Sequence, residues 1–132
     1  MKKIVVNGTF DILHRGHIEM LEYAKSLGDH LLVCIDTDTR VKQLKGPERP
    51  INNQNDRSFM LQSLKCVDAV WYFADEAELE YILETYQPDV MVKGSDYRGK
   101  PIVGKHLCKE IKFYELVTNY STTGLIQRIT NR

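Results

Sequence analysis

The chain has 132 residues, which is enough for one domain with a sizeable core but too few for two. Its 18 basic and 18 acidic residues cancel, so no bulk attraction to nucleic acid or to a membrane surface is expected. No apolar run is long enough to span a bilayer, and a signal peptide's apolar region is missing. The 3 scattered cysteines fit neither a disulfide framework nor a zinc site. We therefore expect one domain over residues 1–132, located in the cytoplasm, with small buried thiols.

Strands and helices are predicted to alternate along the chain. Apolar, largely β-branched runs predict buried strands at 3–7, 31–35, 67–73, 89–92 and 111–117. Between them we predict a helix over 16–28 that ends at Gly28, and a helical turn through Val41. Asn53 or Asn55 caps the next helix, another covers 76–86, and the last ends near Ile129. This alternation with short links predicts an α/β fold, a parallel sheet covered on both faces.

Two other stretches have a simple interpretation. Residues 45–55 form the one long loop, rich in Gly, Pro and Asn, and are a candidate lid over a site. The acidic cluster at 75–84 falls on the outer face of the helix predicted there, so we assign it no function.

The stretch from Gly8 to His17 lies where the first strand turns into the first helix. A helix start offers unpaired backbone N–H groups and the positive end of the dipole, which together favour an anion. His14 and His17 are spaced to share one helix face, and two imidazoles can hydrogen-bond phosphate oxygens. Gly8 suits a close backbone approach to a ligand, and Gly16 suggests that space is needed in the first turn. We predict a phosphate site, against the alternative of one surface and one capping histidine.

Further polar residues follow the other strand ends, and ligands of such sheets bind beyond those ends. Lys42 and Lys45 could neutralise phosphates or serve only solubility. The hydroxyls of Ser121-Thr122-Thr123 could hold a triphosphate tail or simply cap the last helix. The remaining polar residues at these ends are Asp36, Asp38, Lys93, Gly94 and Asp96.

Asp11 and Arg57 each have two interpretations. Asp11 could contact a divalent cation that bridges phosphates, or it could cap the helix. Arg57 lies at a helix start, where a cation opposes the dipole; a bound phosphate would resolve this, and a solvent-facing guanidinium would be unremarkable. No nucleophile lies in a recognisable arrangement with a base, so direct displacement at phosphorus is favoured over a covalent intermediate.

The segments Gly8-Thr9-Phe10-Asp11, His14-Arg15-Gly16-His17 and Ser121-Thr122-Thr123 resemble the two signatures of the cytidylyltransferase-like nucleotidyltransferases. The resemblance covers essentially the whole chain. It implies a Rossmann-like, doubly wound parallel sheet of five strands in a single domain. It also implies magnesium-dependent attack of an acceptor phosphate on the α-phosphorus of a nucleoside triphosphate, release of pyrophosphate, and a homodimer.

With this resemblance, the residues fall into three expected groups. His14, His17 and Lys45 are the expected catalytic residues, with the histidines stabilising the α-phosphate. Asp11, Asp38, Lys42 and Arg57 are expected to bind the acceptor, and Asp11 also the metal. The expected nucleotide-binding residues are Gly8, Thr9, Phe10, His14, Gly16, His17, Lys93, Gly94, Asp96, Asn119, Ser121, Thr122 and Thr123.

The stretches 44–52 and 88–97 are similar to those of adenylyltransferases that make ADP-heptose from heptose 1-phosphate. The short chain and its Asp96-Tyr97-Arg98-Gly99 run are also similar to glycerol-3-phosphate cytidylyltransferases. That group usually carries an arginine and a glycine before Ser-Thr-Thr, and both are missing here, where Tyr120 precedes Ser121. We expect ATP and heptose 1-phosphate, with CTP and glycerol 3-phosphate as the alternative. A non-catalytic nucleotide-binding module is a third hypothesis, which the intact histidines disfavour.

Overall fold

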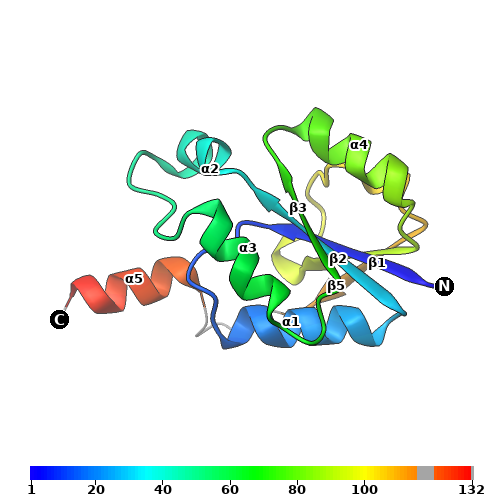
Figure 1. Cartoon of the computed structure of the whole chain (residues 1–132), viewed down its shortest axis with the longest axis horizontal. Coiled ribbons are helices and arrows are strands. Elements are labelled where there is room, and N and C mark those ends of the chain that lie inside the picture. Colours follow the sequence, from blue (N-terminus) through cyan, green and yellow to red (C-terminus); the bar gives the residue numbers. More distant parts are fainter. Residues whose placement is uncertain (116–120, 132) are drawn as a thin grey trace.

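A computed structural model describes residues 1–115 and 121–131, and its centre is a parallel sheet with helices on both faces (Figure 1). The five strands stand in the order β3-β2-β1-β4-β5, and every neighbouring pair is parallel. The strands are β1 (Lys3–Gly8), β2 (His30–Asp36), β3 (Ala69–Phe73), β4 (Val90–Gly94) and β5 (Glu110–Tyr114). This confirms the predicted Rossmann-like, doubly wound α/β fold.

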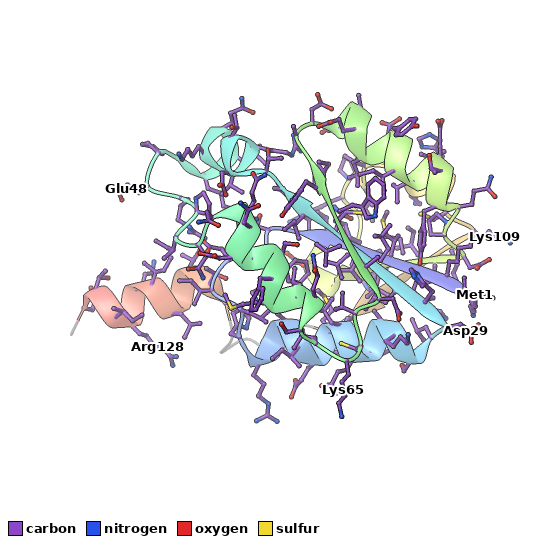
Figure 2. The ribbon with its side chains drawn as sticks, viewed as in Figure 1. Met1, Asp29, Glu48, Lys65, Lys109 and Arg128 are labelled. Carbon is purple, nitrogen blue, oxygen red and sulfur yellow. The ribbon has the colours of Figure 1, made fainter. Side chains whose placement is uncertain are left out.

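Two apolar layers hold the helices against the sheet. Neighbouring strand residues point to opposite faces, so Ile4 and Val6 of β1 pack on one side and Val5 on the other. The first face packs against α1 (Arg15–Ser26) and α3 (Gln54–Gln62), and the second against α4 (Glu76–Tyr86). Charged side chains such as Glu48, Lys65 and Arg128 project outward (Figure 2). Fully burying one such apolar side chain contributes about 1.5–3 kcal/mol, so these layers fix the strand ends firmly.

Of the remaining elements, one helix and one short turn directly follow the carboxyl ends of β2 and β4. α2 (Asp38–Lys45) follows β2, and the short 3-10 turns η1 (Ser95–Tyr97) and η2 (Lys105–Leu107) lie between β4 and β5. α5 (Thr122–Thr130) extends away from the sheet in Figure 1. No helix among residues 1–115 and 121–131 is long and apolar enough to cross a membrane.

Several predicted boundaries need correction. α2 continues to Lys45 instead of ending at Val41, because Val41 is its one buried residue and no apolar stripe marks the helix in the sequence. Gly28 does not cap α1, whose C-cap is Leu27. A Cβ on Gly28 would stand 2.8 Å from the carbonyl oxygen of Lys2, so the glycine permits a close approach of the N-terminal segment.

The other predicted elements differ only slightly or agree. β3 starts at Ala69 and β5 ends at Tyr114, while predicted positions 116–120, including Asn119, lie outside the described residues. The helix at 76–86 is confirmed, and Asn53 caps α3. The described cysteines are free; burial raises the pKa of the Cys34 thiol to about 12, which makes this thiol unreactive.

Candidate active site

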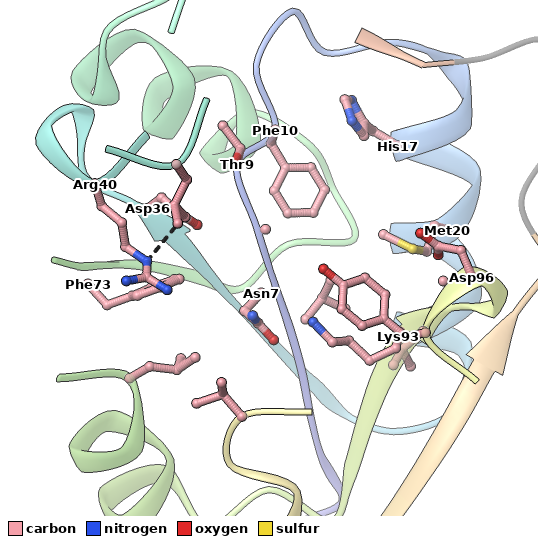
Figure 3. A pocket seen from close by; sticks show the side chains of 18 of the residues that line it. Asn7, Thr9, Phe10, His17, Met20, Asp36, Arg40, Phe73, Lys93 and Asp96 are labelled. Atoms are coloured by element: carbon pink, nitrogen blue, oxygen red, sulfur yellow. Dashed lines mark ion pairs between the residues drawn. The ribbon is translucent and has the colours of Figure 1, made fainter. Parts of the chain in front are cut away.

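A cavity of about 480 Å³ opens at the carboxyl ends of the strands, where the order reverses between β1 and β4 (Figure 3). Loops after β1, β2 and β4 border it, as expected for the switch point of a doubly wound sheet. Apolar side chains from β3, α4 and the segment after η1 form much of its wall. The predicted site residues that line it are Gly8, Thr9, Phe10, His17, Lys45, Lys93, Gly94 and Asp96.

The two predicted histidines form the start of α1. His14 is the N-cap: its Nδ1 accepts a hydrogen bond from the backbone N–H of Gly16 at 3.1 Å. The backbone N–H of His14 donates in turn to Nδ1 of His17 at 3.2 Å, and the two rings stack with centroids 3.7 Å apart. Because both Nδ1 atoms accept, the neutral rings carry their protons on Nε2. Both rings are therefore oriented to donate N–H bonds, which is what a phosphate oxygen accepts.

His17 is held neutral by its surroundings. Its pKa is lowered to about 3, mainly by burial and also by the nearby charges of His14 and Lys45, while Asp11 opposes this shift. Phe10 contributes to this burial, since its ring centroid lies 5.1 Å from that of His17. Phe10 and Ile12 have φ angles of 54° and 50°, a left-handed backbone that is uncommon for residues of this size. The β1–α1 loop therefore carries backbone strain beside the histidine that it positions.

A titration tests this neutral state. We expect the His17 ring to show no protonation step between pH 8 and pH 5, because its pKa is about 3 in the folded chain against 6.5 in a model compound. Folded protein then binds fewer protons than unfolded chain between these two values, so this residue makes stability fall as pH drops from 6.5 toward 3. NMR of ring-labelled histidine would check this, with an unstructured peptide carrying His17 as the reference. A midpoint near 6.5 in the folded protein would contradict it.

Lys93 brings a buried cation to the cavity. Its residue is 8% exposed, and its ammonium lies 4.2 Å from the ring centroid of Tyr97. Burial lowers the pKa of Lys93, while Asp36 and Asp96 favour the charged form. Within the described residues Lys93 forms no ion pair. An anion in the cavity would therefore gain a poorly solvated positive charge as its partner.

Asp11 has another role than the predicted metal contact. It is 1% exposed, and its two carboxylate oxygens accept the backbone N–H groups of Ile51 and Asn52 at 2.7 and 2.9 Å. Nε of Arg49 lies 3.5 Å away as well. The carboxylate is thus occupied by the 46–53 loop, does not cap α1, and does not fit a metal ligand. Among the described residues no group of three His, Cys, Asp or Glu side chains could hold a metal ion.

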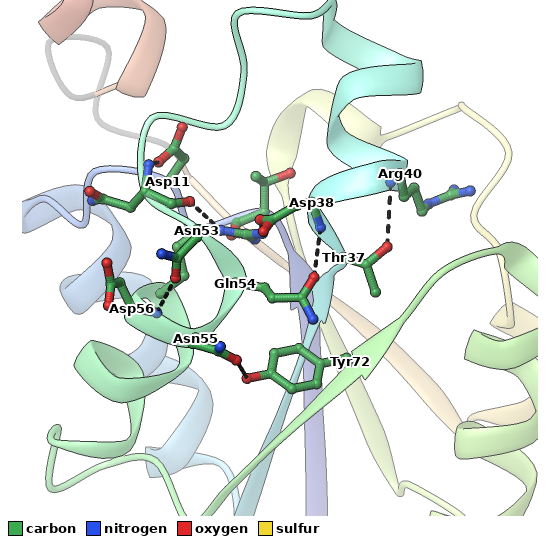
Figure 4. Close-up of polar contacts among 12 residues, drawn as sticks. Asp11, Thr37, Asp38, Arg40, Asn53, Gln54, Asn55, Asp56 and Tyr72 are labelled. Atoms are coloured by element: carbon green, nitrogen blue, oxygen red, sulfur yellow. Dashed lines mark hydrogen bonds and ion pairs between the residues drawn. The ribbon is translucent and has the colours of Figure 1, made fainter.

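Arg57 and Asp38 also lie outside the cavity, in a polar layer formed by contacts between the loops. Figure 4 shows Asp38 among the polar side chains of this region. The Arg57 side chain is fully buried and donates to the carbonyl oxygens of Thr9 and Asn52 and to the Asp38 carboxylate, at 2.9, 3.0 and 2.8 Å. The structure therefore corrects the solvent-facing interpretation of Arg57, whose guanidinium donates to acceptors of the protein itself. Lys42 is exposed on α2 and lines neither of the cavities next to Lys45.

A second cavity of about 470 Å³ lies between the loop after α2 and the start of α5. Lys45 lines both cavities, and Thr123 lines the second one. Ser121 caps α5 by accepting from the N–H of Gly124 at 2.9 Å, while the Thr122 hydroxyl donates to the carbonyl oxygen of Asp11. Of the predicted Ser-Thr-Thr motif, Thr123 alone lines one of these two cavities, and the other two hydroxyls position the helix start.

Two polar cavity residues, Asn7 and Arg40, are not among those that the sequence singles out, whereas Asp36 is one of the polar residues expected at the strand ends. Asn7 lies inside the β1 strand and lines the cavity. A polar residue at the end of an apolar run was the one sequence feature that could have indicated its role. Asp36 ends β2 and pairs with Arg40 of α2. This pair could not be predicted, because the sequence pattern indicates a shorter helix than the α2 that the structure has.

The fold is that of a doubly wound α/β domain with a cavity at its switch point, and hydrogen-bond donors and the start of α1 lie at that cavity. Comparison with known sequences identifies the protein family. The chain belongs to the cytidylyltransferase-like family, whose model matches residues 5–128.

Its relatives include two curated proteins named "Bifunctional protein HldE". The one from Nitratiruptor sp. is 46% identical and that from Aliarcobacter butzleri 49%, each over 97% of this chain. The matches cover 28% and 27% of those proteins, so the chain spans just over a quarter of their length. A solved lipopolysaccharide core biosynthesis protein from Thermoplasma volcanium is 28% identical, with a TM-score of 0.68. That match covers 89% of this chain and 97% of the solved one.

Proposed function

We propose that the chain is a nucleotidyltransferase that transfers AMP from ATP to a phosphorylated sugar, with heptose 1-phosphate as the acceptor, and releases pyrophosphate. The observation that carries this proposal is the position of His17, a neutral N–H donor on a cavity whose Lys45 also lines a second cavity at the start of α5. The similarity to HldE proteins and to a lipopolysaccharide core biosynthesis protein supports the choice of acceptor.

The chemistry is a direct displacement at phosphorus. An oxygen of the acceptor phosphate attacks the α-phosphorus, the bond from that phosphorus to the bridging oxygen breaks, and pyrophosphate leaves with the electron pair. The Nε2–H group of His17 stabilises charge on the α-phosphate oxygens, and His14, which lines neither of the two cavities next to Lys45, supports the His17 ring by stacking against it. Lys45 neutralises charge between the two cavities, and the first turn of α5 with Thr123 receives the pyrophosphate.

Magnesium enters this proposal as part of the nucleotide substrate. Mg²⁺ is commonly held by phosphates, waters and one or two carboxylates. Asp11 does not fit as one of them because its oxygens already accept two backbone N–H groups. A homodimer, a cytoplasmic location and closure of the 45–55 loop as a lid stay predictions.

A substrate panel tests the function. ATP, CTP, GTP and UTP would each be combined with heptose 1-phosphate, glycerol 3-phosphate and a no-acceptor control, and pyrophosphate release measured. We expect ATP with heptose 1-phosphate to give the highest kcat/KM, at least tenfold above any other pair. Preference for CTP with glycerol 3-phosphate would support the alternative enzyme. Nucleotide binding without turnover in every combination would indicate a non-catalytic module.

A further inference from the structure

The cavity at the switch point between β1 and β4 has, at one end, a polar floor that the proposed function does not use. Oδ1 of Asn7 is buried there and has no hydrogen-bond partner among the described residues. Asp36 and Arg40 face the same space (Figure 3), with Nε of Arg40 3.4 Å from the Asp36 carboxylate. That Nε is also buried without a hydrogen bond. Buried polar groups are normally satisfied, so this floor calls for a polar ligand.

The position of the Asp36–Arg40 pair is fixed by its neighbours. Asp36 stands beside Phe73 in the β2–β3 register, and the Arg40 guanidinium lies 5.5 Å from the Phe73 ring centroid. The three side chains therefore make one unit at the ends of β2 and β3 and the first turns of α2. In the view of Figure 3, Asn7 stands between this unit and Lys93.

The chemistry of this floor suits uncharged hydroxyl groups. A carboxylate accepts, a guanidinium donates, and an amide does both, so together they can satisfy neighbouring hydroxyls of a sugar. The opposite charges of Asp36 and Arg40 cancel, so the pair itself offers no net attraction for a phosphate. Two other cations line this cavity, Lys45 and Lys93, and neither forms an ion pair with a carboxylate of the described residues. They lie on other parts of the cavity wall.

We propose that Asn7, Asp36 and Arg40 bind the hydroxyl groups of the acceptor's sugar and so select a polyhydroxylated acceptor; this rests on the proposed function. Arg40 and Lys45 belong to the same short helix, α2. One helix thereby places the sugar at Arg40 and the reacting phosphates at Lys45. These residues replace Asp11, Asp38, Lys42 and Arg57 as the candidates for recognising the acceptor.

Steady-state kinetics of Arg40→Gln and Asn7→Ala test this. We expect Arg40→Gln to raise the KM for heptose 1-phosphate at least tenfold, and Asn7→Ala at least threefold, with the KM for ATP changed by less than twofold. Both variants should also lose most of the wild-type preference for heptose 1-phosphate over glycerol 3-phosphate, which offers fewer hydroxyls. Arg128→Gln is the matched control, since Arg128 is exposed near the end of α5.

The outcomes separate the inference from the function on which it rests. An unchanged KM for heptose 1-phosphate in both variants overturns the inference, and so does an increase confined to the KM for ATP. In both cases wild-type turnover leaves the proposed function standing. A wild-type chain that releases no pyrophosphate with either acceptor overturns the proposed function, and the inference with it. Oδ1 of Asn7 has no hydrogen-bond partner among the described residues. Asn7→Ala is therefore expected to fold even if Arg40→Gln does not.

Discussion

Replacing His17 by alanine is expected to lower kcat for AMP transfer by about 100- to 1,000-fold, the usual effect of removing one preorganised donor to a developing negative charge. His17 is neutral, its proton is on Nε2, and its ring lines the cavity next to Lys45. In the proposed reaction, the alanine variant would lose a donor to the α-phosphate at the stage when charge builds up there. The KM for ATP should change far less than kcat, because the interaction is stronger in the transition state than in the ground state.

The comparison needs two further variants. His106→Ala is the matched control, because His106 is exposed on η2 and outside both cavities next to Lys45, and it should retain wild-type kcat. His17→Gln keeps an N–H donor near the position of Nε2 and should recover part of the lost rate. Circular dichroism would confirm that each variant is folded. If kcat of His17→Ala stays within threefold of the wild type, the proposed role of this histidine is wrong.

Local patterns explain why the sheet and the histidine motif could be predicted from the sequence. A buried parallel strand such as β2 has a continuous apolar sequence, which can be recognised directly. The position at which α1 begins can be predicted from the residues around His14. The edge of the sheet at which the ligand binds then follows from topology alone, because the carboxyl ends of parallel strands lie at the same edge. These features depend on residues close to one another in the chain.

The roles of Asp11 and Arg57 could not be found in this way, because their partners come from distant segments. Asp11 bonds to Ile51 and Asn52, and Arg57 reaches back to Thr9. A charged residue near a helix start usually faces solvent, and no local pattern reveals that three acceptors converge on Arg57. A ligand-binding and a structural arginine look the same until the fold brings those acceptors together.

Replacing Arg57 by methionine is therefore expected to reduce the free energy of unfolding by about 3 kcal/mol, because three hydrogen bonds worth roughly 1 kcal/mol each are lost. The side chain is fully buried, and its removal leaves the Asp38 carboxylate and the carbonyl oxygens of Thr9 and Asn52 without their donor. These acceptors belong to the loop after β1, to α2 and to the loop before α3. The loss would thus loosen the three segments that position His17 and Lys45.

Urea denaturation at neutral pH measures this free energy. Arg98→Met is the matched control: Arg98 is exposed and lies 3.8 Å from exposed Glu115, so its loss should cost less than about 0.5 kcal/mol. Arg57→Lys keeps the charge but cannot reach three acceptors in different directions, so it should be intermediate between wild type and Arg57→Met. It also provides a measurable value if Arg57→Met is unfolded. A loss below about 1 kcal/mol in Arg57→Met would show that the polar layer does not hold the loops, and Arg57 would again be a candidate for binding phosphate.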